Sequence, residues 1–172
     1  NRPGYETSWN CYDRLITHET KTLSDGSLSY DRDKFKQELA DDMNLSDMSV
    51  TFKLKKSAKF HDGALVTAKD VKWSLDRAVT VGGFPTVQMK AGSLSDKEQF
   101  VVVDDNTVRV DFAKKDQLTI PDLAVIVPGI YNSELLKKKA TEKDPWAMDY
   151  TKSNIAGSGA YKVAKWTPDT EV

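Results

Sequence analysis

Few side chains in this sequence could carry out covalent chemistry or hold a metal ion. The 172 residues contain one cysteine, Cys11, and two histidines, His18 and His61. A nucleophilic triad needs a serine or cysteine beside a histidine and an orienting acid, and zinc sites use several closely spaced histidines or cysteines. The histidines are far apart in the sequence, and His61 lies in a turn-forming run where a structural hydrogen bond is its expected role. The sequence therefore predicts no catalytic residue and no metal site.

Two pairs of adjacent aspartates are the remaining candidates for acid–base catalysis. They are Asp41 with Asp42 and Asp104 with Asp105. Neighbouring side chains in a strand point to opposite faces, so the carboxylates of one pair do not converge on one substrate. Residues 157–159 have a Gly-Ser-Gly pattern, but no helix pattern with Lys-Ser/Thr follows, as a phosphate loop would require. A small hydrolase is therefore not favoured, and the sequence predicts a protein that is not an enzyme and needs no cofactor.

The balance of charges argues against a nucleic-acid partner. The chain has 25 Lys and Arg against 26 Asp and Glu, which gives a net charge of −1, whereas a nucleic-acid binder shows a basic stripe. Residues 137–139 form the only run of three basic residues, and a solvated helix end explains such a run. No apolar run approaches the length of a membrane span.

The elements that would position a site are clearest between residues 40 and 77. Residues 49–56 alternate between apolar and polar side chains, which is typical of a half-buried strand. Thr67 and Asp70 have the spacing of a capping box at a helix start. Apolar residues then recur at helical spacing, so the sequence predicts a helix over residues 67–80.

The rest of the chain shows intermixed helix and strand patterns without a strict alternation, which indicates a mixed α/β (α+β) class. We expect helices over residues 9–15, 35–43, 87–94, 116–123 and 132–140, and a further helix starting at residue 144. The segment 35–43 could also be an irregular turn. We expect further strands over residues 16–20, 97–103, 107–112, 125–127 and 159–166.

The order of residues in the best-patterned segment closely resembles the signature of the bacterial extracytoplasmic solute-binding proteins of family 5. The matching positions are Ala40, Val50, Phe52, Leu54, Lys55, residues 59–63, residues 67–71, residues 73–75 and Arg77. Residues 10–16, 103–110 and 155–163 resemble three further segments of the family, in the family's order. The resemblance therefore covers nearly the whole chain.

The resemblance implies a periplasmic-binding-protein-like fold of type II, of which this chain is an N-terminal fragment of the first lobe. Residues 1–18 and 156–172 would be strands of the main first-lobe subdomain, which is incomplete, and residues 19–155 would form the small inserted subdomain. Family members are substrate-binding components of ABC importers for peptides, nickel complexes, opines and some oligosaccharides. The implied partners are therefore a peptide or similar small solute and the permease subunits of an importer. The implied location is periplasmic, with a lipid anchor possible in the full-length protein.

The resemblance also suggests which residues face the ligand. In the family, the loop that precedes the segment matching residues 10–16 lies on the ligand cleft. The resemblance therefore suggests as ligand contacts Tyr5, Glu6, Thr7 and Trp9. Glu6 could meet a cationic group on which Tyr5 or Trp9 stacks. Phe84, in the loop after the signature helix, is the second candidate. A ligand-sensing or protein-interaction module that reuses the fold is the alternative function.

Overall fold

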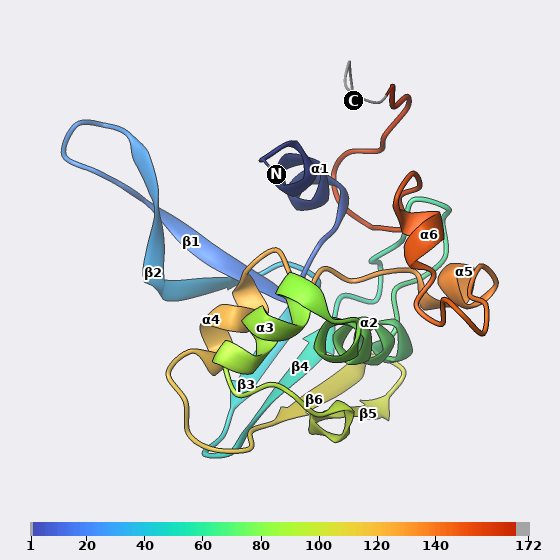
Figure 1. Cartoon of the computed structure of the whole chain (residues 1–172). Coiled ribbons are helices and arrows are strands. Elements are labelled where there is room, and N and C mark those ends of the chain that lie inside the picture. Colours follow the sequence, from blue (N-terminus) through green and yellow to red (C-terminus); the bar gives the residue numbers. More distant parts are fainter. Residues whose placement is uncertain (1, 168–172) are drawn as a thin grey trace.

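A four-stranded antiparallel sheet with a long helix across one face forms the centre of the protein (Figure 1). The computed structural model describes residues 2–167. In spatial order the strands are β3 (Ala40–Leu45), β4 (Ser49–Leu54), β6 (Thr107–Asp111) and β5 (Phe100–Asp104). The helix is α2 (Ala68–Thr80). These elements confirm the mixed α/β class.

Alternation along the central strands explains how this core forms. Val50, Phe52 and Leu54 of β4 are buried, while the intervening Lys53 is exposed. The buried set packs with the apolar stripe of α2, which includes Leu75. The other sheet face is polar, as expected of an antiparallel sheet with one face toward solvent. The predicted strand over 49–56 and helix over 67–80 are both confirmed to within two residues.

The start of α2 is also as predicted, because Thr67 and Asp70 form a capping interaction. The Thr67 amide and hydroxyl both donate hydrogen bonds to Asp70 Oδ2, at 3.0 and 2.7 Å. The other carboxylate oxygen accepts from the amide and hydroxyl of Ser133, at 3.0 and 2.7 Å. One buried carboxylate therefore fixes the first turn of α2 and ties it to the start of a helix far along the chain.

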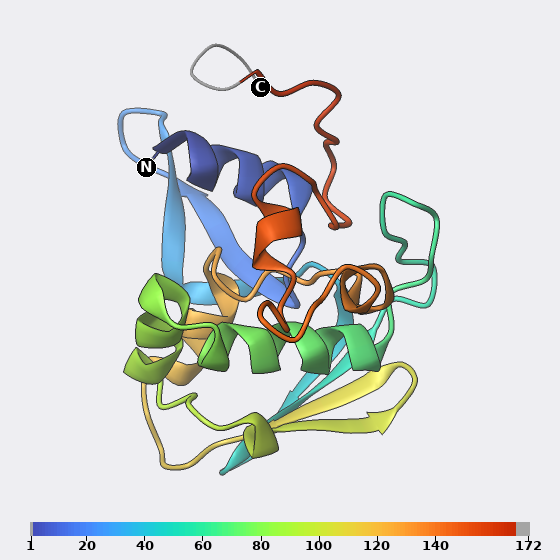
Figure 2. The same cartoon turned by 45° about the vertical axis from the view of Figure 1, so that its right-hand side comes forward.

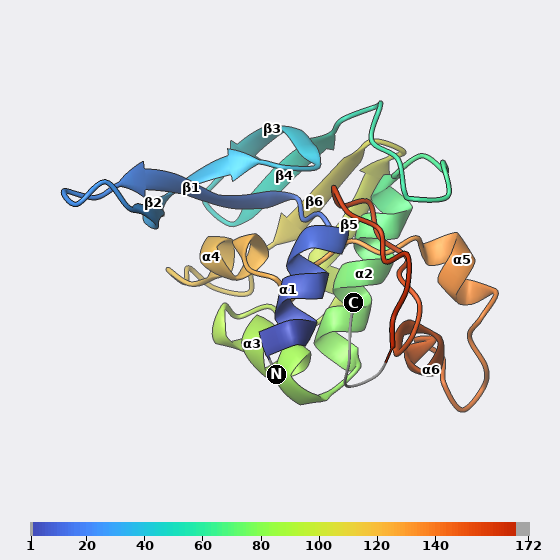
Figure 3. The same ribbon diagram turned by 90° about the horizontal axis from the view of Figure 1, so that it is seen from above.

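The N-terminal part differs from its prediction. Helix α1 spans Arg2–Cys11, not residues 9–15. Two strands, β1 (Ile16–Thr22) and β2 (Leu28–Gln37), form a separate hairpin that projects from the body of the molecule (Figures 1 and 3). The helix or turn predicted over 35–43 was wrong, because these residues belong largely to β2 and β3. Pairing with β1, in which Phe35 faces His18, overrides the weak local pattern.

The remaining helices are short and lie around α2 and beside one another (Figure 2). They are α3 (Gly83–Ala91), the 3₁₀ turn η1 (Lys97–Gln99), α4 (Thr119–Ala124), α5 (Ser133–Lys137) and α6 (Met148–Thr151). Asn132 caps α5, because its side-chain oxygen accepts from the Leu135 amide. Helix α6 starts at Met148, four residues later than predicted. The carboxylate of Asp144 still caps it, because it accepts hydrogen bonds from the Met148 and Asp149 amides.

Two predicted strands do not form. Residues 125–127 are not part of a strand, because they form a bend and a turn directly after α4. Residues 159–166 have no assigned strand either. Instead the amides of Gly159 and Tyr161 donate to the carbonyls of Cys11 and Asn10, at 3.0 and 3.1 Å. Residues 159–161 therefore donate hydrogen bonds to backbone carbonyls at the C-terminal end of α1, and they do not join a sheet.

The division into residues 1–18 with 156–172 and residues 19–155 stays a prediction. Residues 1 and 168–172 of that division lie outside the described part of the chain. Within the described part, the two outer segments do lie side by side, through the hydrogen bonds between residues 159–161 and the end of α1. None of the helices within residues 2–167 has the length and apolar character needed to cross a membrane.

Asp122 on α4 provides a pH-dependent prediction. Its side chain is buried, and Oδ1 accepts from Gln88 Nε2 at 2.7 Å. Burial raises the pKa of Asp122, so the folded state binds its proton more tightly than the unfolded state. Stability contributed by this group is therefore present at acid pH and is lost as the pH rises from the unfolded pKa through the folded one.

We expect Asp122→Asn to remove this pH dependence and to raise the free energy of unfolding at pH 7 by on the order of 1 kcal/mol. Urea denaturation at pH 4 and pH 7 measures the effect. The matched control is Asp25→Asn, an exposed carboxylate whose pKa is lowered by hydrogen bonds from Ser27. Greater stabilisation of Asp122→Asn at pH 4 than at pH 7 would contradict the prediction.

Candidate functional site

Helices α1 and α3 bring together two of the residues that the sequence suggested for ligand contact. The rings of Tyr5 and Phe84 meet edge to face, with centroids 6.4 Å apart and planes at 69°. Both remain about half exposed, at 47% and 53%. Two neighbouring exposed aromatic rings from distant parts of the sequence provide an apolar surface on which a ligand could stack.

Trp9 extends this aromatic surface along α1. It lies four residues after Tyr5, so the two side chains share one face of the helix. The indole is half-buried, and its centroid lies 6.1 Å from that of Tyr30 on β2. Tyr30 was missed by the sequence interpretation, since the strand that carries it was not predicted. We call Tyr5, Trp9, Tyr30 and Phe84 the aromatic surface.

A partly buried ion pair between Arg14 and Glu38 lies beside Trp9. The guanidinium carbon of Arg14 lies 4.1 Å from the centroid of the Trp9 ring, and Arg14 is only 3% exposed. Its Nη2 donates to Glu38 Oε1, and its backbone amide donates to Glu38 Oε2, both at 2.6 Å. Glu38 thus compensates the buried charge and fixes the guanidinium. Arg14 and Glu38 lie in segments that the sequence interpretation had not linked to the site.

The helical geometry of α1 places the other two predicted ligand contacts, Glu6 and Thr7, on different sides of the helix. The predicted cleft loop before residue 10 is a helix, and successive side chains turn by about 100°. Glu6 therefore lies beside the Tyr5–Trp9 face, and its side chain is exposed. Thr7 lies on the far side of the helix from Tyr5 and is half-buried. Its proposed ligand contact stays a prediction.

Residues 156–162, which we call the strap, hold α1 in place. Gly157 and Gly159 pass so close to the end of α1 that an added Cβ would lie 2.0 Å from Cys11 O and 2.5 Å from Asn10 O, respectively. The Ala156 amide donates to the hydroxyl of Tyr12, at 3.1 Å. Burial raises the pKa of Tyr12, so this hydroxyl keeps its proton at physiological pH.

His61 joins the strap to the loop after β4. Its amide donates to Gly157 O at 2.9 Å, and its ring Nε2 lies 2.8 Å from Gly159 O. Lys162 Nζ donates to His61 O at 2.7 Å. The structural role predicted for His61 is therefore confirmed, and the strap links this loop to the helix that carries the aromatic surface.

Comparison with known proteins relates this chain to bacterial solute-binding proteins. The family described as bacterial extracellular solute-binding proteins, family 5 Middle, matches residues 34–172. Among curated proteins, the probable D,D-dipeptide-binding periplasmic protein DdpA of Escherichia coli (strain K12) is 29% identical over 164 residues. That alignment covers 94% of this chain and 29% of the relative.

Solved structures share the fold. The PBP AgaA from A. tumefaciens R10, in complex with agropinic acid, is 26% identical with a TM-score of 0.72. The match covers 98% of this chain and 30% of that one. The periplasmic binding protein DppA from Helicobacter pylori, in complex with peptide STSA, is 19% identical with a TM-score of 0.72, over 97% of this chain and 33% of that one. The chain thus spans about a third of the length of these relatives, and its fold is periplasmic-binding-protein-like.

Proposed function

Because the chain belongs to family 5 of the bacterial extracellular solute-binding proteins, we propose that it is part of the substrate-binding component of an ABC importer. We propose that its ligand is a peptide or a similar small solute. The observation that carries this proposal is the family match over residues 34–172. It favours solute uptake over a sensing or protein-interaction module, and the name of the curated relative supports a peptide-like ligand.

In this proposal the aromatic surface is one wall of the binding cleft. Tyr5 and Phe84 present exposed rings, and Arg14 holds Trp9 from the side of the protein body. A solute that lies on these rings would be enclosed when a second lobe closes over it. The exposed Glu6 next to Tyr5 would attract a cationic group such as a peptide N-terminus. No bond is made or broken, so the protein would not act as an enzyme.

A solute-binding component works outside the cytoplasmic membrane, in the periplasm or held to the membrane as a lipoprotein. Its partners would be the solute and the permease subunits of the importer. Uptake of radiolabelled D-alanyl-D-alanine, a D,D-dipeptide, tests this in cells with and without the gene. Loss of saturable uptake on deletion is expected, and uptake that is unchanged for this dipeptide, for peptide STSA and for agropinic acid would overturn the proposal.

Phe84→Ala gives a sharper test of the binding wall. We expect the variant in the complete gene product to weaken solute binding about 10-fold, because an exposed ring that stacks on the ligand is lost. Isothermal titration with the solute that shows saturable uptake measures the change. Val103→Ala on β5 is the control, since Val103 is exposed to the same extent, 53%, and lies outside the aromatic surface. Equal affinities of the two variants for the solute would show that Phe84 does not contact it.

A further inference from the structure

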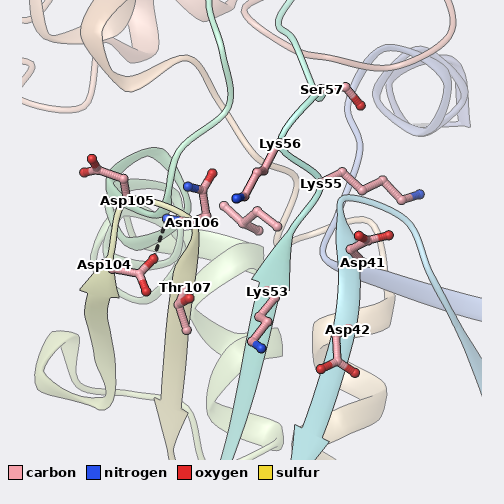
Figure 4. A pocket seen from close by; sticks show the side chains of 11 residues that line it. Asp41, Asp42, Lys53, Lys55, Lys56, Ser57, Asp104, Asp105, Asn106 and Thr107 are labelled. Atoms are coloured by element: carbon pink, nitrogen blue, oxygen red, sulfur yellow. Dashed lines mark hydrogen bonds between the residues drawn. The ribbon is translucent and has the colours of Figure 1, made fainter.

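A groove at one end of the four-stranded sheet is distinct from the aromatic surface (Figure 4). It has a volume of about 910 Å³ and is open to solvent. Strand ends and turns provide its walls, from β3, from β4 and the turn after it, and from the turn between β5 and β6. The side chains that carry its charge are Asp41, Asp42, Lys53, Lys55, Lys56, Asp104 and Asp105.

The charges in this groove follow a pattern. Lys53 and Lys56 lie between aspartates on either side, and the side chain of Lys55 extends past Asp41 (Figure 4). None of the three lysines takes part in an ion pair with another residue of the 2–167 segment. A hydrogen bond from the Asn106 amide, 2.8 Å long, holds the pKa of Asp104 below its ordinary value, so this carboxylate stays ionised. The groove therefore presents three lysines that lack an ion-pair contact beside four aspartates, of which Asp105 is paired with Lys69 at 3.8 Å.

The backbone holds this pattern in place. Lys53 is the cross-strand neighbour of Asp42 on one side and of Thr107 on the other. The adjacent turn is fixed to α2, because the Ala68 amide donates to Asp105 O at 2.9 Å. The charges are thus carried by a rigid framework, which favours selective electrostatic recognition.

The groove is remote from the proposed ligand wall. It lies at the N-terminal end of α2, whereas Phe84 follows the C-terminal end of the same helix. A helix of 13 residues is about 20 Å long. A change in the groove can therefore be tested without direct disturbance of the aromatic surface.

The side chains that line the groove are better suited to bind the surface of a partner protein than to enclose a small solute. Small-molecule pockets are enclosed and mostly apolar, with few polar groups. Here Leu54 is the only apolar lining residue, and its side chain is buried. The acid–base–acid order complements a loop that carries a carboxylate between basic residues.

We propose that this groove docks such a loop from the membrane subunits of the importer. The inference rests on the proposed function, which supplies the class of partner. Unpaired lysines increase the rate of association with an acidic group, and this effect weakens as salt screens the charges. The docking interaction should therefore be salt-dependent and should depend on Lys55 and Lys56.

The test compares two matched variants of the complete gene product. K55E/K56E reverses two groove charges and leaves Lys53, which faces Asp42, in place. The control K138E/K139E makes the same change in net charge in the exposed segment after α5. Binding to the purified permease subunits of the cognate importer in nanodiscs is measured by biolayer interferometry at 50 and 300 mM salt. Titration with the transported solute is run in parallel.

We expect K55E/K56E to bind the nanodiscs at least 10-fold more weakly than wild type at 50 mM salt, with solute affinity unchanged. The control should stay within two-fold of wild type. Equal nanodisc binding by K55E/K56E and wild type would overturn the groove proposal and leave the proposed function intact. Failure of wild type to bind both nanodiscs and solute would instead overturn the proposed function. If K55E/K56E unfolds, K55Q/K56Q is expected to show a smaller loss in the same direction, and no loss would again overturn the proposal.

Discussion

Replacement of Gly159 by alanine is expected to lower the free energy of unfolding by about 3 kcal/mol, as overpacking against a rigid neighbour does. A Cβ at this position would lie 2.5 Å from Asn10 O and from Cys11 C, and 2.8 Å from Tyr12 N. All three are backbone atoms, so no side chain can move aside. The strap would have to leave the end of α1, with loss of the hydrogen bond from the Gly159 amide to Cys11 O.

Urea denaturation followed by tryptophan fluorescence measures this loss. Gly4→Ala in α1 is the control, because a Cβ there would meet no atom within 4 Å other than those of its chain neighbours and its own helix backbone. Alanine also favours helix over glycine, so this control is expected to be neutral or more stable by up to about 1 kcal/mol. If Gly159→Ala were as stable as Gly4→Ala, the strap would not be packed against α1 as described.

Replacement of Asp70 by alanine is expected to lower the free energy of unfolding by about 4 kcal/mol, since the removal of a buried charged acceptor leaves its donors unpaired. Asp70 is 5% exposed and accepts four hydrogen bonds, two from Thr67 and two from Ser133. The first turn of α2 and the start of α5 would therefore lose their common acceptor.

Asp25→Ala is the matched control for Asp70→Ala. Asp25 is exposed and accepts two hydrogen bonds from Ser27, so we expect its loss to cost less than about 1 kcal/mol. Denaturation of both variants under the same conditions gives the comparison. An equal effect of the two substitutions would show that the capping carboxylate is not the shared anchor of the two helices.

The sequence correctly predicted secondary structure where the local residue pattern and the tertiary packing favour the same conformation. The alternation of Val50, Phe52 and Leu54 predicted β4, and the spacing of Thr67 and Asp70 predicted the start of α2. Both patterns are local and each is satisfied by the nearest layer of the core. The resemblance to family 5 through the same residues was confirmed by the family match.

The errors occur where partners distant in the sequence decide the conformation. Residues 35–37 join a strand because β1 lies beside them, and the amides of Gly159 and Tyr161 are satisfied by carbonyls of α1 instead of a strand. The aromatic surface shows the same limit. Tyr5 and Phe84 were suggested separately, but their contact depends on how α1 and α3 pack. No local pattern indicated that Arg14 would support Trp9.

Isothermal titration of the complete gene product tests the central claim most directly. The probes are D-alanyl-D-alanine, peptide STSA and agropinic acid, which sample the ligand classes named for the similar proteins. We predict saturable binding of one solute per molecule for at least one probe, with affinity reduced in Phe84→Ala and unchanged in Val103→Ala. A folded protein that gives no saturable heat with any of the three probes would contradict the assignment of a peptide-like solute to this site.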